Sequence, residues 1–411
     1  MPKKATIPPS PVLVSPSPID FTQLSPLPAT GGVSADTPLE ITDEFDEDFG
    51  PKVEVPWVPS RVTPQNFLST GITILNLALT NSVDCGLEKG TMTWLIGSSS
   101  GGKTLVALLL CAEAANNPHF DDYDILYADV EGGAQFDLRA LFGNKLADRI
   151  IFARMPNGEP FRTVEDFYAY ADKRQRISKP FILVLDSMDA LGTTPEAARF
   201  DANIAEREKN LEKGDGKEYA NISTGYGDGK AKINSSGLKR LRNRLPVTGS
   251  MFFCISQERD NIITGYKTTS GGNAIRFFSD TALWLSKGAD ISRDWEKKPR
   301  VYGQYSHFKI EKNRTSGMKT KIQFPILIGT GISDVDSGVD WLAEEGVFKL
   351  PKVPATQSWE GTLPDGSEFK LTREKLIRYF EDNPDTLKEM MKQRWYSILE
   401  NIIPKRRKKY Q

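Results

Sequence analysis

The chain has 411 residues, with 53 lysines and arginines against 54 aspartates and glutamates. The net charge by itself therefore does not suggest a nucleic-acid partner. A DNA-binding surface would have to come from local clusters of basic residues. Three cysteines and two histidines count against a disulfide or zinc framework and against a histidine-based metal or triad enzyme. No apolar run is long enough to span a membrane, and the N-terminus lacks the apolar stretch of a signal peptide. We expect a cytoplasmic protein with free thiols and no membrane partner.

The two ends of the chain differ from its middle in composition. Thirteen of the 26 prolines precede residue 65, and an acidic run occupies residues 43–48. Such a segment cannot bury enough apolar surface to offset the entropy of ordering it. We predict a disordered arm over residues 1–60. Residues 405–409 are all lysine or arginine, and predict an exposed basic tail over 404–411.

From about residue 61, strand and helix signals alternate along the chain. Short apolar runs predict strands at residues 91–96, 123–128, 181–185, 251–255 and 281–285. Helical patterns follow at 105–115 and 196–211, and a basic helix is expected at 238–244. This alternation predicts an α/β fold, with a mostly parallel central sheet flanked by helices over residues 61–332. The character changes after residue 331, and we expect a small α+β C-terminal domain over 333–403, helical from residue 372.

Residues 97–104 match the phosphate-loop pattern G-x-x-x-x-G-K-[ST], directly after a predicted strand and at the start of a helix. Glycines let backbone amides curl around a phosphate, and the helix N-terminus favours the anion. Lys103 would reach the β- and γ-phosphates, and the Thr104 hydroxyl would ligate Mg²⁺. The alternative is an ordinary Gly/Ser turn, which requires no Lys-Thr pair in register. The predicted ATP-binding residues of the loop are Gly97, Ser98, Ser99, Ser100, Gly101, Gly102, Lys103 and Thr104.

Acidic residues follow two of the predicted strands. Asp186 comes directly after the strand at 181–185, where a carboxylate meets the metal or its water, so it is predicted as an ATP-site and metal ligand with Thr104. Glu131 ends another predicted strand, residues 126–131, and is predicted as the base that orients the attacking water. Asp129, two residues earlier on the same side of the strand, is the rival. A solvated, unpaired acid is the further alternative for either residue.

Several segments in the same order resemble the RecA-type recombinases of bacteria and bacteriophages. They are residues 69–78, the phosphate loop, 183–191 (Leu-Val-Leu-Asp-Ser-Met-Asp-Ala-Leu) and 268–278 (Thr-Thr-Ser-Gly-Gly-Asn-Ala-Ile-Arg-Phe-Phe). Residues 328–332, 339–347 and 379–388 are similar to the bacterial-type C-terminal domain. The resemblance covers roughly residues 65–395. It implies a RecA-like P-loop ATPase that coats single-stranded DNA as a filament and promotes homologous pairing and strand exchange in DNA recombination and repair.

The resemblance also implies roles for three further residues. Gln257 matches the glutamine that senses the γ-phosphate and passes that state to the adjacent DNA loop. Lys312 and Arg314 match two basic residues that reach the ATP of the neighbouring subunit, where a cation stabilises transition-state charge. A polar residue closing a strand and a solvated basic strand end are the plainer interpretations. With Glu131 and Lys103, these residues form the implied catalytic set.

Two loops are implied for DNA binding. Glycine permits close backbone approach, lysine and arginine neutralise phosphates, and tyrosine inserts against bases. Solvated surface loops are the alternative. The residues of the first loop, 214–232, and of the helix after it are Tyr226, Lys230, Lys232, Lys239 and Arg240. Those of the second loop, 258–272, and of its following helix are Arg259, Lys267, Thr268, Thr269, Gly271, Gly272, Asn273 and Arg276.

The expected cofactors are ATP and Mg²⁺. The expected partners are single- and double-stranded DNA, further copies of the chain in a helical filament, and single-strand-binding and loader proteins. Two other functions fit the same core: a ring helicase or strand-annealing ATPase, and a non-hydrolysing filament protein that ATP switches. The C-terminal resemblance counts against the first. The proline-rich arm stands where the bacterial type has the helix and strand that dock on a neighbour, so the mode of polymerisation is not predicted.

Overall fold

A computed structural model describes residues 58–212, 228–260, 267–269, 273–350 and 358–404. Contacts divide the chain into a first unit, Met1–Glu54, and a second, Val55–Gln411. Everything described below belongs to the second unit. The predictions for the arm at 1–57 and for the tail at 405–411 lie outside the described residues.

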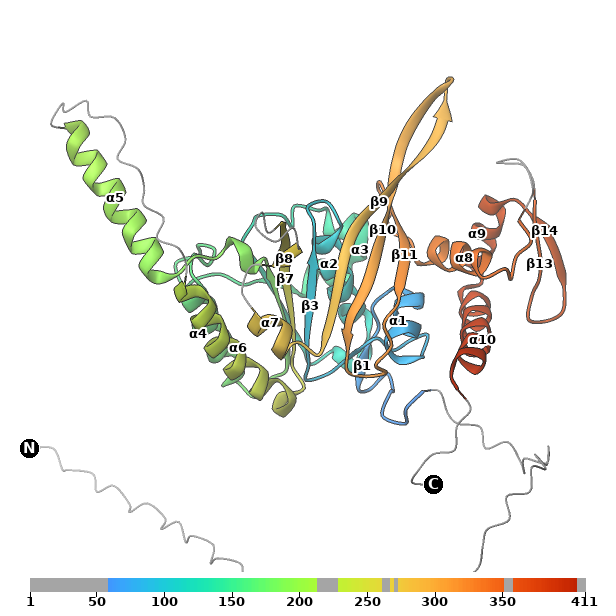
Figure 1. Ribbon diagram of the computed structural model, residues 1–411, viewed down its shortest axis with the longest axis horizontal. Coiled ribbons are helices and arrows are strands. Elements are labelled where there is room, and N and C mark those ends of the chain that lie inside the picture. The colour runs from blue at the N-terminus through green and yellow to red at the C-terminus, as the bar shows by residue number, and fades with distance from the viewer. Residues whose placement is uncertain (1–57, 213–227, 261–266, 270–272, 351–357, 405–411) are drawn as a thin grey trace, which may run out of the picture. The chain divides into compact units, whose positions relative to one another are not determined.

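A ten-stranded sheet forms the centre of the fold (Figure 1). Its order is β12-β11-β10-β9-β3-β7-β6-β4-β5, and β8 pairs with β7 beside this path. The strands from β9 to β5 pair in parallel, whereas β10, β11, β12 and β8 are antiparallel to their neighbours. The strands are β3 (Met92–Gly97), β4 (Asp124–Asp129), β5 (Ile150–Phe152), β6 (Phe181–Asp186), β7 (Met251–Asp260), β8 (Lys267–Thr269), β9 (Thr281–Trp295), β10 (Lys298–Asn313), β11 (Lys321–Leu327) and β12 (Gly331–Ile332). The mostly parallel sheet predicted from the sequence is confirmed.

Helices cover both faces of the sheet, and the side chains of the central strands β3, β4, β6, β7 and β9 alternate between two apolar clusters. Tyr127 and Val184 belong to the cluster under α2, while their chain neighbours Leu126 and Leu183 belong to the cluster under α4 and α6. This alternation along each strand determines which residues at the strand ends face α2. The helices on the α2 face are α1 (Thr73–Thr80), α2 (Lys103–Asn116) and α3 (Leu138–Arg149); those on the other are α4 (Val164–Gln175), α6 (Asp228–Thr248) and α7 (Asn273–Phe278).

The regions predicted as DNA loops contain more regular structure than expected. Helix α5 (Thr194–Glu212) matches the predicted helix, and α6 already begins at Asp228, so Lys230 and Lys232 are helical rather than in a loop. Ile233 packs against the apolar cluster under α4, which stabilises this early start. Strand β7 continues past residue 255 and pairs with β8, so the second predicted loop is in part a β-hairpin. Tyr226, Gly271 and Gly272 lie outside the described part of the chain.

Strand β9 runs ten residues beyond the predicted end at residue 285 and forms a long antiparallel ribbon with β10. The turn residues Glu296 and Lys297 both have positive φ, 53° and 61°, as a tight hairpin turn requires. The outer part of the ribbon is exposed, so its sequence carries no apolar alternation. That is why the sequence pattern did not reveal it.

The C-terminal part contains helices and a β-hairpin, as the α+β expectation required. Two strands before residue 372 form a hairpin, and the predicted helical end is divided into two helices at Asn383. Its elements are α8 (Asp334–Glu344), β13 (Trp359–Thr362), β14 (Glu368–Leu371), α9 (Arg373–Asp382) and α10 (Pro384–Ile402). Asp334 accepts hydrogen bonds from the backbone N–H of Thr73 at 2.6 Å and from its hydroxyl at 2.7 Å, which ties α8 to the start of α1. The boundary between residues 332 and 333 stays a prediction.

Four short elements complete the fold. Strands β1 and β2 pair with each other apart from the main sheet. They and the two 3₁₀ helices are β1 (Phe67–Leu68), β2 (Leu87–Glu88), η2 (Pro118–Phe120) and η3 (Met188–Ala190). Cys85, Cys111 and Cys254 are free and buried, which confirms the prediction of free thiols. Within the described ranges, no helix combines the length and apolarity needed to cross a membrane.

Arg373 joins α9 to α8 and is expected to stabilise the C-terminal part. Its guanidinium donates to Asp340 at 2.8 Å and to Asp336 at 2.9 Å. Arg373→Ala leaves both carboxylates without this partner, and we expect a loss of about 2 kcal/mol in the free energy of unfolding. The side chain is 30% exposed, which places the loss below that for a fully buried pair. Chemical denaturation measures it. Arg378→Ala, an exposed change on the same helix, is the control, and an equal effect of both changes would contradict the prediction.

Candidate nucleotide-binding site

The phosphate loop, Asp186, Glu131 and Gln257 meet at the carboxyl ends of the parallel strands. Strand β7 lies between β3 and β6, and Gln257 pairs in register with Gly97 at the start of the phosphate loop. One strand further, Asp129 of β4 pairs in register with Asp186 of β6. Residues at this edge of parallel sheets form the usual crevice for ligands. The sheet therefore brings the phosphate loop, Asp186 and Gln257 to one edge.

The phosphate loop folds tightly between β3 and α2. A Cβ added at Gly97 would lie 2.1 Å from the Leu285 carbonyl oxygen, so only glycine fits there. Gly102 has a φ of 92°, which glycine adopts without strain. Lys103 is 9% exposed, and its ammonium donates to the carbonyl oxygens of Gly97 at 3.1 Å and Ser98 at 2.7 Å. The lysine is thus held inside the loop, where an incoming phosphate would compete for its protons.

Asp186 and Thr104 form the predicted metal side of the site. The Thr104 hydroxyl donates to Asp186 Oδ2 at 2.7 Å, and the Tyr127 hydroxyl donates to the same oxygen at 2.8 Å. Burial raises the pKa of the Asp186 carboxyl. The two hydrogen bonds lower this pKa, and the charge of Glu131 raises it further. A nearby cation would counter that rise.

The donor set fits Mg²⁺. This ion prefers oxygen ligands and keeps several of its waters, so one hydroxyl and one carboxylate from the protein suffice beside nucleotide phosphates. In the part of the chain that the structure describes, no group of three or more His, Cys, Asp or Glu side chains could hold a metal ion. The described residues therefore contain no site that would hold a metal by protein carboxylates, imidazoles or thiolates alone.

The structure separates the two rival acids, Glu131 and Asp129. Asp129 ends β4 and accepts hydrogen bonds from the backbone N–H groups of Gly133 at 3.0 Å and Ala134 at 3.2 Å, so it fixes the loop that follows. Glu131 lies two residues beyond the strand, rather than at its end as expected from the sequence. Its carboxylate accepts hydrogen bonds from the Ser187 hydroxyl and from the Gln257 amide, the latter at 3.0 Å. The geometry favours Glu131 as the acid that faces the site.

Gln257 connects this acid to the second predicted DNA region. Its side-chain amide donates to Glu131, and its backbone N–H donates to Asp189 Oδ2 at 2.7 Å. It lies within β7, three residues before the strand's end at Asp260, instead of just after the strand. The same strand continues into the hairpin with β8. Gln257 and the hairpin therefore share one continuous strand.

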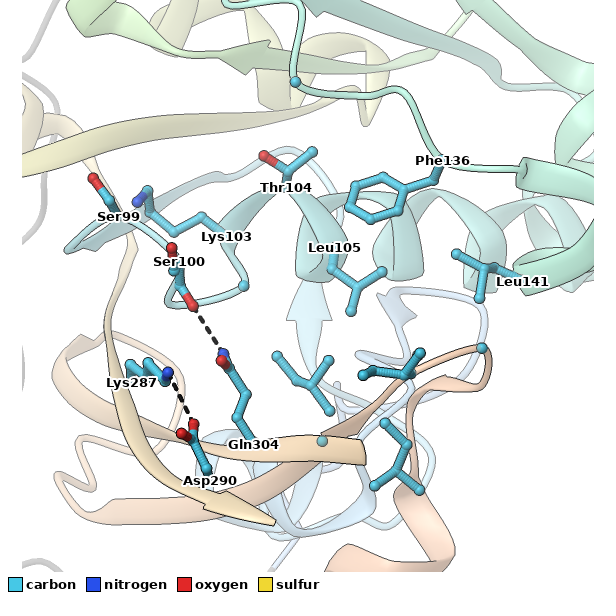
Figure 2. Close-up of a pocket in the computed structure, with 18 of the residues that line it drawn as sticks. Ser99, Ser100, Lys103, Thr104, Leu105, Phe136, Leu141, Lys287, Asp290 and Gln304 are labelled. Atoms are coloured by element: carbon cyan, nitrogen blue, oxygen red, sulfur yellow. Dashed lines mark hydrogen bonds and ion pairs between the residues drawn. The ribbon is translucent and has the colours of Figure 1, made fainter. Parts of the chain in front are cut away.

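A pocket of about 860 Å³ extends from the phosphate loop. Figure 2 shows Ser99, Ser100 and Lys103 at one side, and Leu105, Phe136 and Leu141 grouped at the other. The β9–β10 ribbon, β11 and the residues that follow β11 also line the pocket. From β10, Gln304 donates to the Ser100 carbonyl oxygen at 2.8 Å. The volume suits a nucleotide-sized ligand, with a polar end for phosphates and an apolar end for a base.

Sequence reasoning did not find Tyr127, Ser187, Phe136 or Gln304. Tyr127 carries a local signal, since it stands two residues before Asp129 and so shares its face of β4, and Ser187 directly follows Asp186. The partners of the other residues depend on contacts between distant segments, such as Gln304 with Ser100.

Lys312 and Arg314 are not brought to the phosphate loop of their own chain. Asn313, between them, pairs with Thr281 at the start of β9, and Thr281 also pairs with Thr93 at the start of β3. The loop follows the other end of β3. Lys312 donates to the carbonyl oxygens of Arg276 and Phe277, at 2.8 and 3.0 Å, and Arg314 forms an ion pair with Asp280 at 3.0 Å.

The predicted DNA residues have different surroundings. Lys230 donates to the Leu191 carbonyl oxygen, and Arg240 donates to Asp172 at 2.9 Å. Arg276 pairs with Glu311 at 2.9 Å. Lys232 and Lys239 are exposed on α6. The side chains that lie outside the described part are those of Arg259, Lys267, Thr268, Thr269 and Asn273.

The mostly parallel sheet and the phosphate loop after β3 together define a P-loop protein with a RecA-like core. Curated proteins that resemble the chain are named RecA. Those of Trichodesmium erythraeum (strain IMS101) and Brucella canis (strain ATCC 23365 / NCTC 10854 / RM-666) are each 26% identical over 329 residues, which is 79% of this chain and 78% of theirs. The RecA of Nostoc punctiforme (strain ATCC 29133 / PCC 73102) is 25% identical over 328 residues, again 79% of this chain and 78% of its own. No protein-family profile matches the chain. The similarity supports a RecA-like recombinase.

Proposed function

We propose that the protein is an ATP-dependent recombinase that forms filaments on single-stranded DNA and promotes homologous pairing and strand exchange in recombination and repair. The observation that carries the proposal is the 3.0 Å hydrogen bond between Gln257 and Glu131, because Gln257 belongs to the strand that continues into the β7–β8 hairpin. One amide thus contacts the acid of the nucleotide site and anchors a DNA-binding element. A nucleotide-binding protein without a DNA cycle has no need of this connection.

In this proposal the chain's own residues perform defined parts of ATP hydrolysis. The backbone amides of residues 97–104 hold the phosphates, and Lys103 exchanges its two carbonyl acceptors for phosphate oxygens. Glu131 orients the attacking water, and Ser187 and Gln257 hold its carboxylate. Thr104 and Asp186 would hold Mg²⁺, which would supply positive charge beside the phosphates. The apolar end of the pocket, with Phe136 and Leu141, receives the base.

DNA is proposed to bind along the β7–β8 hairpin, α6 and α7. Lys232 and Lys239 are exposed there, and Arg240 and Arg276 are exposed despite their ion pairs. Surface pairs of this kind are worth little in water, so phosphates can replace the carboxylates at low cost. Lys230 is the weakest candidate, because it already contacts backbone carbonyls. Cytoplasmic location and accessory single-strand-binding and loader proteins belong to the same proposal.

Changing Lys312 and Arg314 together to alanine is expected to reduce ATP turnover about 100-fold or more, while the monomer still binds ATP. Both residues lie at the sheet edge opposite the phosphate loop, so in a filament they can complete only a neighbour's site. Hydrolysis assays and equilibrium nucleotide binding separate the two effects. Changing Lys319 and Lys321 on β11 and the turn before it is the matched control. Turnover that persists in the double variant would refute the cross-interface role.

The proposed function is tested by ATP turnover of the full chain with and without single-stranded DNA, together with electron microscopy in ATP. Stimulation of hydrolysis by DNA and helical filaments are the expected results. Closed rings would favour a helicase or annealing ATPase. Filaments with no DNA-stimulated hydrolysis would favour an ATP-switched structural protein. Either result would overturn the recombinase proposal.

A further inference from the structure

Tyr127 places a phenol beneath the metal side of the site, and none of the roles assigned above includes it. The residue is fully buried in β4, with 0% exposure. Its hydroxyl donates to Asp186 Oδ2 at 2.8 Å. The same oxygen accepts the Thr104 hydroxyl at 2.7 Å. Tyr127 therefore contacts the carboxylate that the proposed Mg²⁺ site depends on.

The strand register accounts for this contact. Tyr127 pairs directly with Val184 on β6, and Asp186 is two residues further along β6 on the same face. Diagonal neighbours of this kind are within reach of a long aromatic side chain. The ring itself lies in the apolar cluster under α2, with Ile125 and Val184. Phenylalanine would fill that space equally well, so only the hydroxyl requires an explanation.

The two hydroxyls leave the carboxylate of Asp186 in a defined state. Both donate to Oδ2, and across the described ranges no hydrogen bond to Oδ1 is found. A carboxylate fixed at one oxygen cannot rotate freely, so its second oxygen also has a defined position. Partners behind a metal-site carboxylate commonly orient it and tune its affinity for the ion.

We propose that Tyr127 is a positioning residue of the Mg²⁺ site, which fixes Oδ2 of Asp186 so that Oδ1 meets the ion or a water bound to it. The inference rests on the proposed ATPase function and deepens it. It assigns a role to a side chain that touches neither nucleotide nor metal. Removal of the hydroxyl then affects the dependence on Mg²⁺ rather than the binding of nucleotide alone.

Tyr127→Phe in the full chain tests the inference, with Tyr168→Phe as matched control. The Tyr168 hydroxyl also has one side-chain acceptor, Asn234 Oδ1 at 3.1 Å, but it lies among α4 and α6 on the opposite face of the sheet. For Tyr127→Phe, the Mg²⁺ concentration giving half-maximal ATP turnover is expected to rise about tenfold. Binding of a fluorescent ATP analogue in EDTA should stay at the wild-type level, while its strengthening by Mg²⁺ shrinks. Tyr168→Phe should match wild type in both assays.

The possible outcomes are distinguishable. An unchanged Mg²⁺ dependence in Tyr127→Phe overturns the inference, even if its melting temperature falls, because the hydroxyl is then only structural. If wild type itself shows no Mg²⁺-dependent nucleotide binding, the proposed function fails and the inference fails with it. 4-Aminophenylalanine at position 127 retains a donor at the same place. It should restore the wild-type Mg²⁺ dependence, and a lack of rescue counts against the role even where Tyr127→Phe folds poorly.

Discussion

Lys103→Ala is expected to lower ATP turnover by at least about 100-fold and to abolish nucleotide-dependent assembly. The ammonium is buried at the centre of the phosphate loop, where it donates to two loop carbonyls. Burial lowers its pKa, but the nearby carboxylates of Asp186 and Glu131 act in the opposite direction and favour the charged form. Alanine leaves the phosphates without this cation and the two carbonyls without their donor. Equilibrium binding of a fluorescent ATP analogue and light scattering measure the losses.

Lys89→Ala is the control for the Lys103 experiment. Lys89 is also partly buried and donates to a backbone carbonyl, that of His119 at 2.8 Å, but it does not line the pocket. Its replacement should leave nucleotide binding unchanged. Tight ATP binding by Lys103→Ala would remove the phosphate role of this lysine and with it the main support for the nucleotide site.

Glu131→Gln should have the second large effect: turnover falls by about 10²- to 10⁴-fold while ATP binding is retained. Glutamine keeps the size of the side chain and can still bond to Ser187 and Gln257, but it cannot serve as a base. Single-turnover hydrolysis with and without single-stranded DNA measures the loss. DNA binding in ATP should become longer-lived, because hydrolysis no longer ends the bound state.

Asp129→Asn tests which of the two acids, Asp129 or Glu131, acts in hydrolysis, a choice that the sequence alone left open. Asp129 holds the backbone amides of Gly133 and Ala134, and an asparagine oxygen can still accept from one of them. We expect a modest loss of stability and turnover within about tenfold of wild type. If the large loss occurred in Asp129→Asn and not in Glu131→Gln, the two acids would have to exchange roles.

The phosphate loop and Asp186 were predictable because each is defined by local sequence. A loop with fixed spacing and an acid after a buried strand can be recognised in the sequence without knowing the order of the strands in the sheet. The alternation of strands and helices likewise predicted the parallel sheet, and the structure confirms it. The choice of Glu131 over Asp129 was of a different kind, because it depends on which backbone amides the following loop presents.

Other features depend on contacts that no local pattern reports. The hydroxyl of Tyr127 finds its partner only through the register of β4 against β6. The outer β9–β10 ribbon has no buried face, so its length left no periodic signal. The hairpin of β13 and β14 was missed although Pro364, Asp365 and Gly366, a strong turn signal, stand between its strands. There the error was one of interpretation, since the signal was present.

The position of Lys312 and Arg314 gives the molecule two unlike ends. A contact that carries these residues of one copy to the phosphate loop of the next joins different surfaces, so it is heterologous and does not close after two copies. In an open chain, the terminal copy whose phosphate loop faces solvent lacks the borrowed cations. Turnover per molecule then rises with polymer length and falls on dilution, even when every nucleotide site is filled. Under the proposed cross-interface role, the rate of hydrolysis would therefore depend on the state of assembly.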